Sequence, residues 1–235
     1  MHILLAEGSV IFKMKDINSE LLSYLEKNIF PIYDKFLSHG KDHIDSVIEQ
    51  SLLIAKDYDV DINMVYTIAC YHDIGLINGR QNHEIESGKF LFEDNNLKKF
   101  FNDLDIIIMK EAVEDHRGSR SLPPRSIYGK IVSDADRDTN VEILAKRQLP
   151  TSIKYYPNLK TFDEHFERCY NYIKDRANEN FKFNLWTENN TMRHRMNQFE
   201  KDFKDKELTK NIYYKQYQYI LKNGLFYKIQ NEYMD

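Results

Sequence analysis

The sequence predicts an all-α protein, a helical bundle followed by a C-terminal helical extension. In most segments apolar residues recur every three or four positions with charged residues on the opposite side, as in helices that pack one face against a core. Only 8 glycines and 5 prolines interrupt the 235 residues. No segment shows four or more cycles of strict apolar and polar alternation, so strands are expected to be few or absent.

Helical spacing divides the first part of the chain into helices at 18–30, 41–57, 62–74, 83–94 and 97–116. The second helix has its apolar residues at i, i+3, i+4, i+8 and i+11, namely Ile44, Val47, Ile48, Leu52 and Ala55. Pro31 ends the first helix and Gly75 ends the third. A further helix follows Pro123 and Pro124, at a position where a helix start tolerates proline. Its apolar side carries Ile127, Tyr128, Ile131, Val132 and Ala135.

The character of the chain changes after Pro150. Residues 151–160 are expected to form a connection, and two long charged helices that carry aromatic residues are expected at 161–178 and 187–207. The tail at 208–235 is rich in tyrosine and lysine and should end in another helix. We therefore divide the chain into a core at 18–150 and a helical extension at 151–235 that packs on this core.

The composition, 42% apolar and 30% charged, is typical of a soluble globular protein. A net charge of −4 argues against nucleic-acid binding, and no run approaches the about 20 apolar residues that span a bilayer. The two cysteines, Cys70 and Cys169, form no CxxC unit, which fits a reducing compartment. Residues 1–5 are a short apolar run without the features of a signal peptide. We therefore expect a cytoplasmic protein that binds neither membrane nor nucleic acid.

The most informative feature is His72-Asp73, which directly follows the apolar residues 68–71. An imidazole and a carboxylate are both good ligands for a divalent metal. Adjacent residues point about 100° apart on a helix, so the two reach one ion only near a helix end, where Gly75 would place them. The pair alone is better explained as a capping Asp beside a solvated His.

Other polar residues in apolar surroundings favour the interpretation of His72-Asp73 as part of a metal site. His39 and His43 lie at the start of one apolar-periodic helix, and Asp134, Asp136 and Arg137 lie in another. Buried carboxylates are rarely left without a metal or a cation. Helical geometry does not distinguish Asp134 from Asp136, because both lie about equally far from the centre of the apolar face.

In its order H…HD…D, the chain resembles the HD-domain superfamily of metal-dependent phosphohydrolases over residues 35–150. The resemblance implies an HD-domain helical bundle and four metal ligands: His43, His72, Asp73 and Asp136. It alone selects Asp136 and leaves Asp134 as a supporting or substrate-facing acid. The metal would be Mn, Mg, Fe, Co or Ni, with Mn or Mg favoured. Whether one or two ions bind stays open.

The same resemblance suggests roles for residues around the metal. Asp73 would orient or deprotonate the attacking water, and His83 and His116 would act in catalysis or bind a second metal. Leu76 occupies the position where some HD enzymes carry a lysine that contacts the substrate phosphate, so positive charge must come from elsewhere. The residues assigned to substrate binding are His39, Arg80, Arg117, Asp134, Arg137 and Arg195. A capping role for His39 is an equal alternative.

Residues 161–203 resemble the C-terminal half of small bacterial HD hydrolases associated with nucleotide (pyro)phosphohydrolysis. The implied activity is metal-dependent hydrolysis of a phosphate ester or phosphoanhydride, with a small phosphorylated molecule, preferably an NTP or dNTP, as the substrate. Alternatives are a di-iron HD-type oxygenase, a non-catalytic HD signalling module, and hydrolysis of a cyclic dinucleotide or an alarmone. The sequence leaves the oligomeric state open, a homodimer included.

Overall fold

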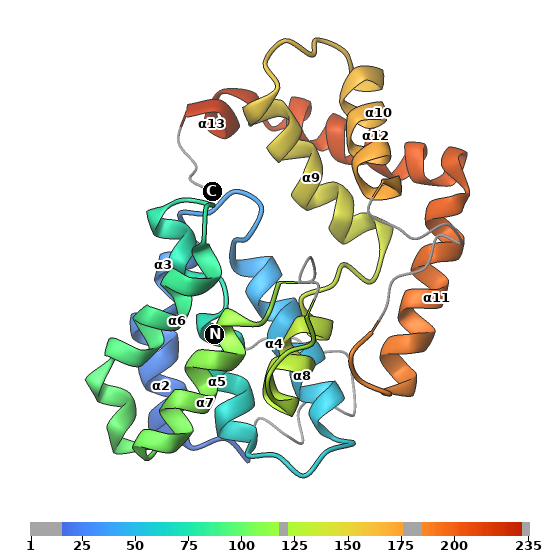
Figure 1. The fold of residues 1–235 in the computed structure, drawn as a ribbon. Coiled ribbons are helices and arrows are strands. Elements are labelled where there is room, and N and C mark those ends of the chain that lie inside the picture. The colour runs from blue at the N-terminus through green and yellow to red at the C-terminus, as the bar shows by residue number, and fades with distance from the viewer. Residues whose placement is uncertain (1–15, 118–121, 176–184, 232–235) are drawn as a thin grey trace. The chain divides into compact units, whose positions relative to one another are not determined.

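The computed structural model describes residues 16–117, 122–175 and 185–231, so the N-terminal run at 1–5 lies outside the described residues. Within these ranges every regular element is a helix, which confirms the all-α prediction (Figure 1). None of the described helices has the length and apolar character needed to cross a membrane. The chain forms two compact units, the first made of residues up to Lys35 and His39–Arg137, the second of Phe36–Ser38 and the residues from Asp138 onward.

The first unit is a bundle in which α5 and α8 each contact both α4 and α7, while α6 packs on α7. The predicted helices at 18–30, 41–57, 62–74 and 83–94 are present within a few residues of their expected bounds. The elements of this unit are α2 (Ser19–Asn28), α3 (Phe30–Tyr33), α4 (Lys41–Ala55), α5 (Ile62–Tyr71), η1 (Ile74–Asn78), α6 (His83–Glu93), η2 (Asn95–Lys99), α7 (Asp103–Glu114) and α8 (Ile127–Ala135).

Helix α5 is the central element that leads to His72. Asp61 caps its N-terminus by accepting a hydrogen bond from the Asn63 backbone N–H. From Met64 to Tyr71 every side chain of α5 is buried, as expected of a helix that neighbours cover on all sides. The helix ends at Tyr71, so His72 and Asp73 lie where the chain leaves the helix, as predicted.

The predicted helix at 97–116 is wrong at its start. Leu97 lies in the 3-10 turn η2, and α7 begins only at Asp103. The reason is a capping box, in which the Asn102 side chain accepts from the Asp105 backbone and the Asp105 carboxylate accepts from the Asn102 backbone N–H. This reciprocal pair satisfies orphan donors and so defines a new helix start.

The second unit contains α9 (Val141–Tyr155), α10 (Phe162–Lys174), α11 (Asn190–Lys204), α12 (Lys206–Lys222) and α13 (Phe226–Asn231). Helix α9 contacts each of the other four, so the compact units divide after Arg137, whereas the sequence division at Pro150 cuts through α9. The helix expected at 161–178 is observed as α10, and residues 176–178 lie outside the described residues.

The connection expected at 151–160 is also wrong in part, because α9 continues through Pro150 to Tyr155. Leu149, Pro150 and Ile153 are buried in the core of this unit, and their burial offsets the hydrogen bond that proline removes. The Thr151 hydroxyl donates to the Arg147 carbonyl at 2.9 Å and so satisfies a backbone acceptor within the same turn. Burial therefore outweighs the local preference of proline to end a helix.

Candidate metal centre

The four predicted ligands come from three helix ends of the first unit. His43 lies in the first turn of α4, His72 and Asp73 follow α5, and Asp136 follows α8. Each offers one ligand atom, and these atoms lie within 4.8 Å of one another. The structure therefore brings together all four side chains that the sequence analysis selected.

One oxygen of Asp73 faces the first pair of histidines. Its Oδ2 lies 3.1 Å from His72 Nε2 and 3.3 Å from His43 Nε2, and the two Nε2 atoms are 3.1 Å apart. Asp136 Oδ1 completes the group at 3.1 Å from His43 Nε2 and 3.9 Å from His72 Nε2. The result is a cluster of two imidazoles and two carboxylates.

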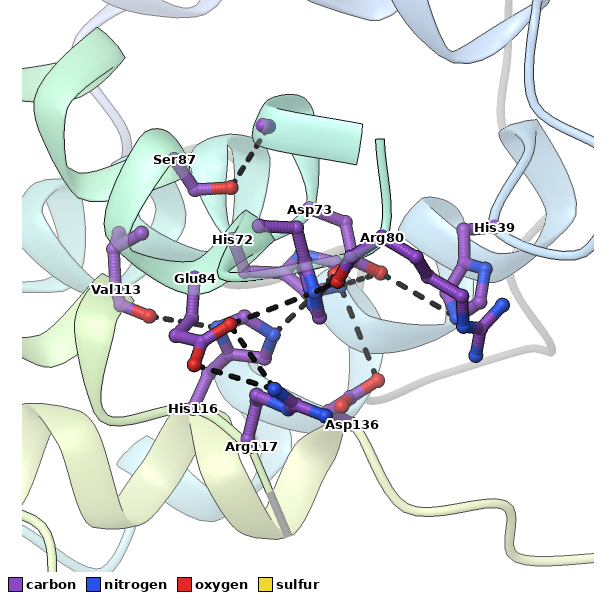
Figure 2. A network of polar contacts seen from close by, with 12 residues as sticks. His39, His72, Asp73, Arg80, Glu84, Ser87, Val113, His116, Arg117 and Asp136 are labelled. Carbon is purple, nitrogen blue, oxygen red and sulfur yellow. Dashed lines mark hydrogen bonds and ion pairs between the residues drawn. The ribbon is translucent and has the colours of Figure 1, made fainter. Parts of the chain in front are cut away.

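The other oxygen of Asp73 faces a second pair of histidines. Its Oδ1 lies 3.2 Å from His83 Nε2 and 3.3 Å from His116 Nε2, and these three residues form a second group with metal-binding potential. His83 is the first residue of α6, and His116 comes directly after the C-cap residue of α7. Figure 2 shows Asp73 at the centre, with His72, His116 and Asp136 around it. Asp73 thus connects two ligand groups through its two oxygens.

Backbone carbonyls determine which nitrogen three of the histidines present to Asp73. His72 Nδ1 lies 2.8 Å from the Ala69 carbonyl, and His116 Nδ1 lies 2.6 Å from the Val113 carbonyl. His83 Nδ1 contacts the carbonyl of Arg80 at 3.1 Å. A carbonyl only accepts, so each Nδ1 carries the proton and each Nε2 presents a lone pair to Asp73. This tautomer is the one that binds a metal through Nε2.

The two carboxylates are ionised in spite of their burial. Burial alone would raise the pKa of Asp73, but His72 and His39 hold this pKa well below its usual value. Burial would likewise raise the pKa of Asp136, and the neighbouring His43, with Nε2 3.1 Å from Asp136 Oδ1, lowers it instead. Asp73 Oδ2 and Asp136 Oδ1 are both buried and make no hydrogen bond. Two ionised oxygens without a donor need a cation nearby.

The residues present fit a divalent metal. The lone pair of His72 Nε2 faces His43 Nε2 and Asp73 Oδ2 at contact distance, an arrangement that is repulsive unless a cation or a proton lies between them. Two ligand atoms that each lie about 2.1 Å from one ion are about 3.0 Å apart at a right angle and about 3.4 Å apart at a tetrahedral angle. The separations of 3.1–3.3 Å match this spacing.

The residues assigned to the substrate differ in their surroundings. His39 is buried, with Nε2 4.0 Å from Asp73 Oδ2 and its ring edge-on to His43, so it belongs to the rim of the cluster. Arg80 is exposed, beside His39 in Figure 2. Arg117 donates to both carboxylate oxygens of Glu84 at 3.3 Å. Arg195 lies on α11 of the second unit, and its role stays a prediction.

The structure separates Asp134 from Asp136. Asp136 is the C-cap residue of α8, where the chain leaves the helix, and its carboxylate joins the metal-binding group. Asp134 lies inside α8, is fully buried, and has Oδ1 3.8 Å from Arg137 Nε. Among the described residues, Asp134 belongs to neither metal-binding group. The position at which α8 ends therefore places Asp136, and not Asp134, within reach of the other three candidate ligands.

Tyr33 is a supporting residue that the sequence analysis missed. Its buried hydroxyl donates to the Cys70 carbonyl at 2.8 Å and accepts from the Asp73 backbone N–H at 3.3 Å. Its ring stacks on the His72 imidazole with centroids 6.4 Å apart. Tyr33 lies in the short helix α3, far from His72 in sequence, and carries no local signal that could have identified it.

A second missed contact supports His116 through its neighbour. Asp115 is fully buried and accepts from the Arg125 backbone N–H at 2.7 Å and from Arg125 Nε at 3.0 Å. Arg125 Nη2 also donates to Glu114 at 2.8 Å. These bonds hold the segment before α8 against the C-terminus of α7, where His116 is located. Charged neighbours at positions 114–116 are the only sequence signal for this arrangement.

Comparison with known proteins agrees with this description. A family model described as HD domain matches residues 40–141. The chain is similar to the crystal structure of a predicted HD superfamily hydrolase from an uncultured Thermotogales bacterium, with 20% sequence identity and a TM-score of 0.50. The alignment covers 83% of this chain and 92% of that chain. No curated protein matches. At this identity the structural similarity supports the all-α fold.

Proposed function

Because residues 40–141 match the HD domain, we propose that the first unit is a metal-dependent hydrolase that cleaves a phosphate ester or phosphoanhydride. The observation that carries the proposal is the buried Asp73 carboxylate, with the Nε2 atoms of two histidines facing each of its oxygens. A structural or capping Asp would be surrounded by donors. The order of the ligands along the chain is the one that the HD family resemblance implies.

His43, His72 and Asp136, together with Asp73 Oδ2, would hold one cation. His83 and His116, together with Asp73 Oδ1, would hold a second. When bound, the metal supplies Lewis acidity that lowers the pKa of a water ligand and neutralises charge at the phosphoryl group. Imidazole suits Fe and Ni, whereas carboxylate suits Mn and Mg. The mixed donor set is therefore compatible with each of the expected ions, and we use Mn²⁺ as the first ion to test.

The chain's own residues would position the reaction. Ionised Asp73 accepts a hydrogen bond from the attacking water and orients it, and its low pKa makes it a weak proton acceptor. His39 is the better acceptor for the proton, because it lies at the rim of the cluster with Nε2 4.0 Å from Asp73 Oδ2. Burial of the cluster excludes bulk water and strengthens each electrostatic interaction.

A nucleotide is the substrate class that we propose first, because residues 161–203 resemble nucleotide-hydrolysing HD proteins. The test is release of phosphate or pyrophosphate from a panel of NTPs, dNTPs, cyclic dinucleotides and alarmones with Mn²⁺ added to protein purified without chelator. The His72→Ala, Asp73→Ala double variant should lose activity by about 100-fold or more, because it removes ligands of both groups. His194→Ala, at an exposed position of α11, is the matched control. Full activity in the double variant would refute the proposal.

The shared Asp73 also favours one second candidate, oxidation of a small substrate by a di-iron centre. Two ligand groups joined by one carboxylate are a plausible frame for two irons, and imidazole and carboxylate are common iron ligands. Protein loaded anaerobically with Fe²⁺ distinguishes the two functions. Consumption of O₂ with a small-molecule substrate, without phosphate release under Mn²⁺, would replace the hydrolase proposal.

A further inference from the structure

The four arginines predicted to bind the substrate are not equivalent. Arg117 already bonds to both oxygens of Glu84. Arg80 is solvent-exposed, and Arg195 belongs to the second unit. Arg137 lies next to the metal-binding group, has only 15% of its side chain exposed, and is poor in partners.

The guanidinium of Arg137 lacks the contacts that its burial requires. In the part of the chain that the structure describes, its side chain makes no hydrogen bond, and Nε is buried without a partner. The nearest carboxylate oxygen, Asp134 Oδ1, is 3.8 Å from Nε, close enough for charge attraction but too far for a hydrogen bond. A buried guanidinium is normally paired and hydrogen-bonded, because desolvating its charge is costly.

Two other arginines in the described part of the chain are satisfied by their neighbours. Arg147, with 17% of its side chain exposed, donates to the Ser38 carbonyl at 3.1 Å and to Asp138 Oδ1 at 2.8 Å. Arg125 is more exposed than Arg137 and still donates to Asp115, Glu114 and the Glu111 carbonyl. Arg137 differs from both, because it is less exposed than either and its planar set of donors is left for a group outside the described chain.

The position of Arg137 indicates what that partner is. It directly follows Asp136, and its backbone N–H donates to the Asp134 carbonyl at 3.3 Å, so it lies in the same turn that presents Asp136 to the metal-binding group. Attraction to Asp134 restrains the guanidinium without occupying its donors. A guanidinium matches the oxygens of a phosphoryl group in geometry and charge.

We propose that Arg137 binds the phosphoryl oxygens of the substrate beside the metal centre and is the main side-chain contact for its negative charge. This inference rests on the proposed function. Arg137 would supply the positive charge that some HD enzymes obtain from a lysine at the position of Leu76. Asp134 would then act as a positioning residue for Arg137.

The test measures binding rather than turnover. Mn²⁺ affinity is measured by titration with EPR detection, and inorganic phosphate is then titrated into the Mn²⁺-loaded protein by calorimetry. Arg137→Met should leave Mn²⁺ affinity within about twofold and weaken phosphate binding about tenfold or more, because it removes charge-assisted hydrogen bonds. Arg137→Lys keeps the charge but not the bidentate geometry and should fall between the two. Arg193→Met, at an exposed position of α11, is the matched control.

The outcomes separate this inference from the proposed function. Unchanged phosphate affinity in Arg137→Met, or no phosphate binding by the wild type, overturns the role of Arg137 alone. An equal loss of Mn²⁺ affinity also overturns it, because Arg137 would then act through Asp136. Failure of the wild type to bind Mn²⁺ overturns the proposed function and this inference with it. If Arg137→Met fails to fold, the same comparison with Arg137→Lys decides the question.

Discussion

Gly75 is the position where we expect a single added methyl group to disturb both the fold and the metal centre. It lies in η1, two residues after Asp73, and packs directly on the start of α6. A Cβ at this position would lie 2.3 Å from the His83 carbonyl oxygen and 2.5 Å from the Ser87 backbone nitrogen. Ordinary contact begins at 3.4 Å, so the Gly75→Ala variant must move two backbone segments apart by about 1 Å.

The expected loss in the free energy of unfolding is about 2–4 kcal/mol. Overpacking against backbone atoms costs about 1–3 kcal/mol, because flexible side chains cannot absorb the strain. The hydrogen bond from Gly75 N–H to the Ser87 hydroxyl, now 2.8 Å, would lengthen and cost about 1 kcal/mol more. The movement would also carry His83 away from Asp73 Oδ1, from which it is now 3.2 Å distant, and so weaken metal binding in the second group.

Urea unfolding followed by circular dichroism measures the stability, and titration with Mn²⁺ measures the second effect. Gly129→Ala is the matched control, because its Cβ would meet nothing closer than the Pro124 Cβ at 3.0 Å and alanine favours the helix there. We expect this control to stay within about 1 kcal/mol of the wild type. A Gly75→Ala protein with wild-type stability and wild-type metal binding would refute the reasoning from close packing.

Two further predictions concern groups away from the metal. Burial alone would raise the pKa of Asp94, but hydrogen bonds from Tyr24 and Tyr71 lower it below the usual 3.8. The stability contributed by Asp94 is therefore present above pH 3.8 and lost as the pH falls through the lowered pKa, so Asp94→Asn should cost about 1–2 kcal/mol at pH 7 and progressively less below 3.8. Burial raises the pKa of the Cys70 and Cys169 thiols, so neither should react with a thiol reagent until the protein unfolds.

Each of these has a direct check. Urea midpoints of wild type and Asp94→Asn are compared from neutral pH down to pH 3, and a difference that stays constant or grows on acidification would contradict the carboxylate's role. For the thiols, Ellman's reagent is added with and without urea. Rapid reaction of the native protein would show that the two cysteines are more accessible than their zero exposure implies.

The candidate metal-binding cluster could be predicted because its signal is local. His72-Asp73 follows an apolar run and precedes Gly75, and this pattern indicated a helix end that the structure confirms. The choice between Asp134 and Asp136 could not be made from periodicity, since it depends on the residue at which α8 ends. Family resemblance was needed there, and the structure places the carboxylate of Asp136 in the cluster.

The features that were missed depend on contacts between distant residues or on competition between local signals. Tyr33 supports His72 and Asp73 only because the fold brings α3 to the C-terminal end of α5. There the Tyr33 hydroxyl donates to the Cys70 carbonyl. At Pro150 the preference of proline opposes the burial of Leu149 and Ile153, and only the packed core decides between them. The start of α7 was predicted too early because Leu97 continues the apolar pattern ahead of the Asn102 cap.

The carbonyl contacts of the three histidines have a consequence for how the centre tolerates mutation. In many metal sites the outer partner of a histidine is a carboxylate side chain, which one substitution can remove. Here the partners are main-chain oxygens of Ala69, Arg80 and Val113, each three positions before its histidine. No exchange of side chain at those positions deletes the acceptor. The side chains around these residues can therefore vary widely without changing which imidazole nitrogen carries the proton. The requirement is that the backbone at each of these three positions keeps its conformation.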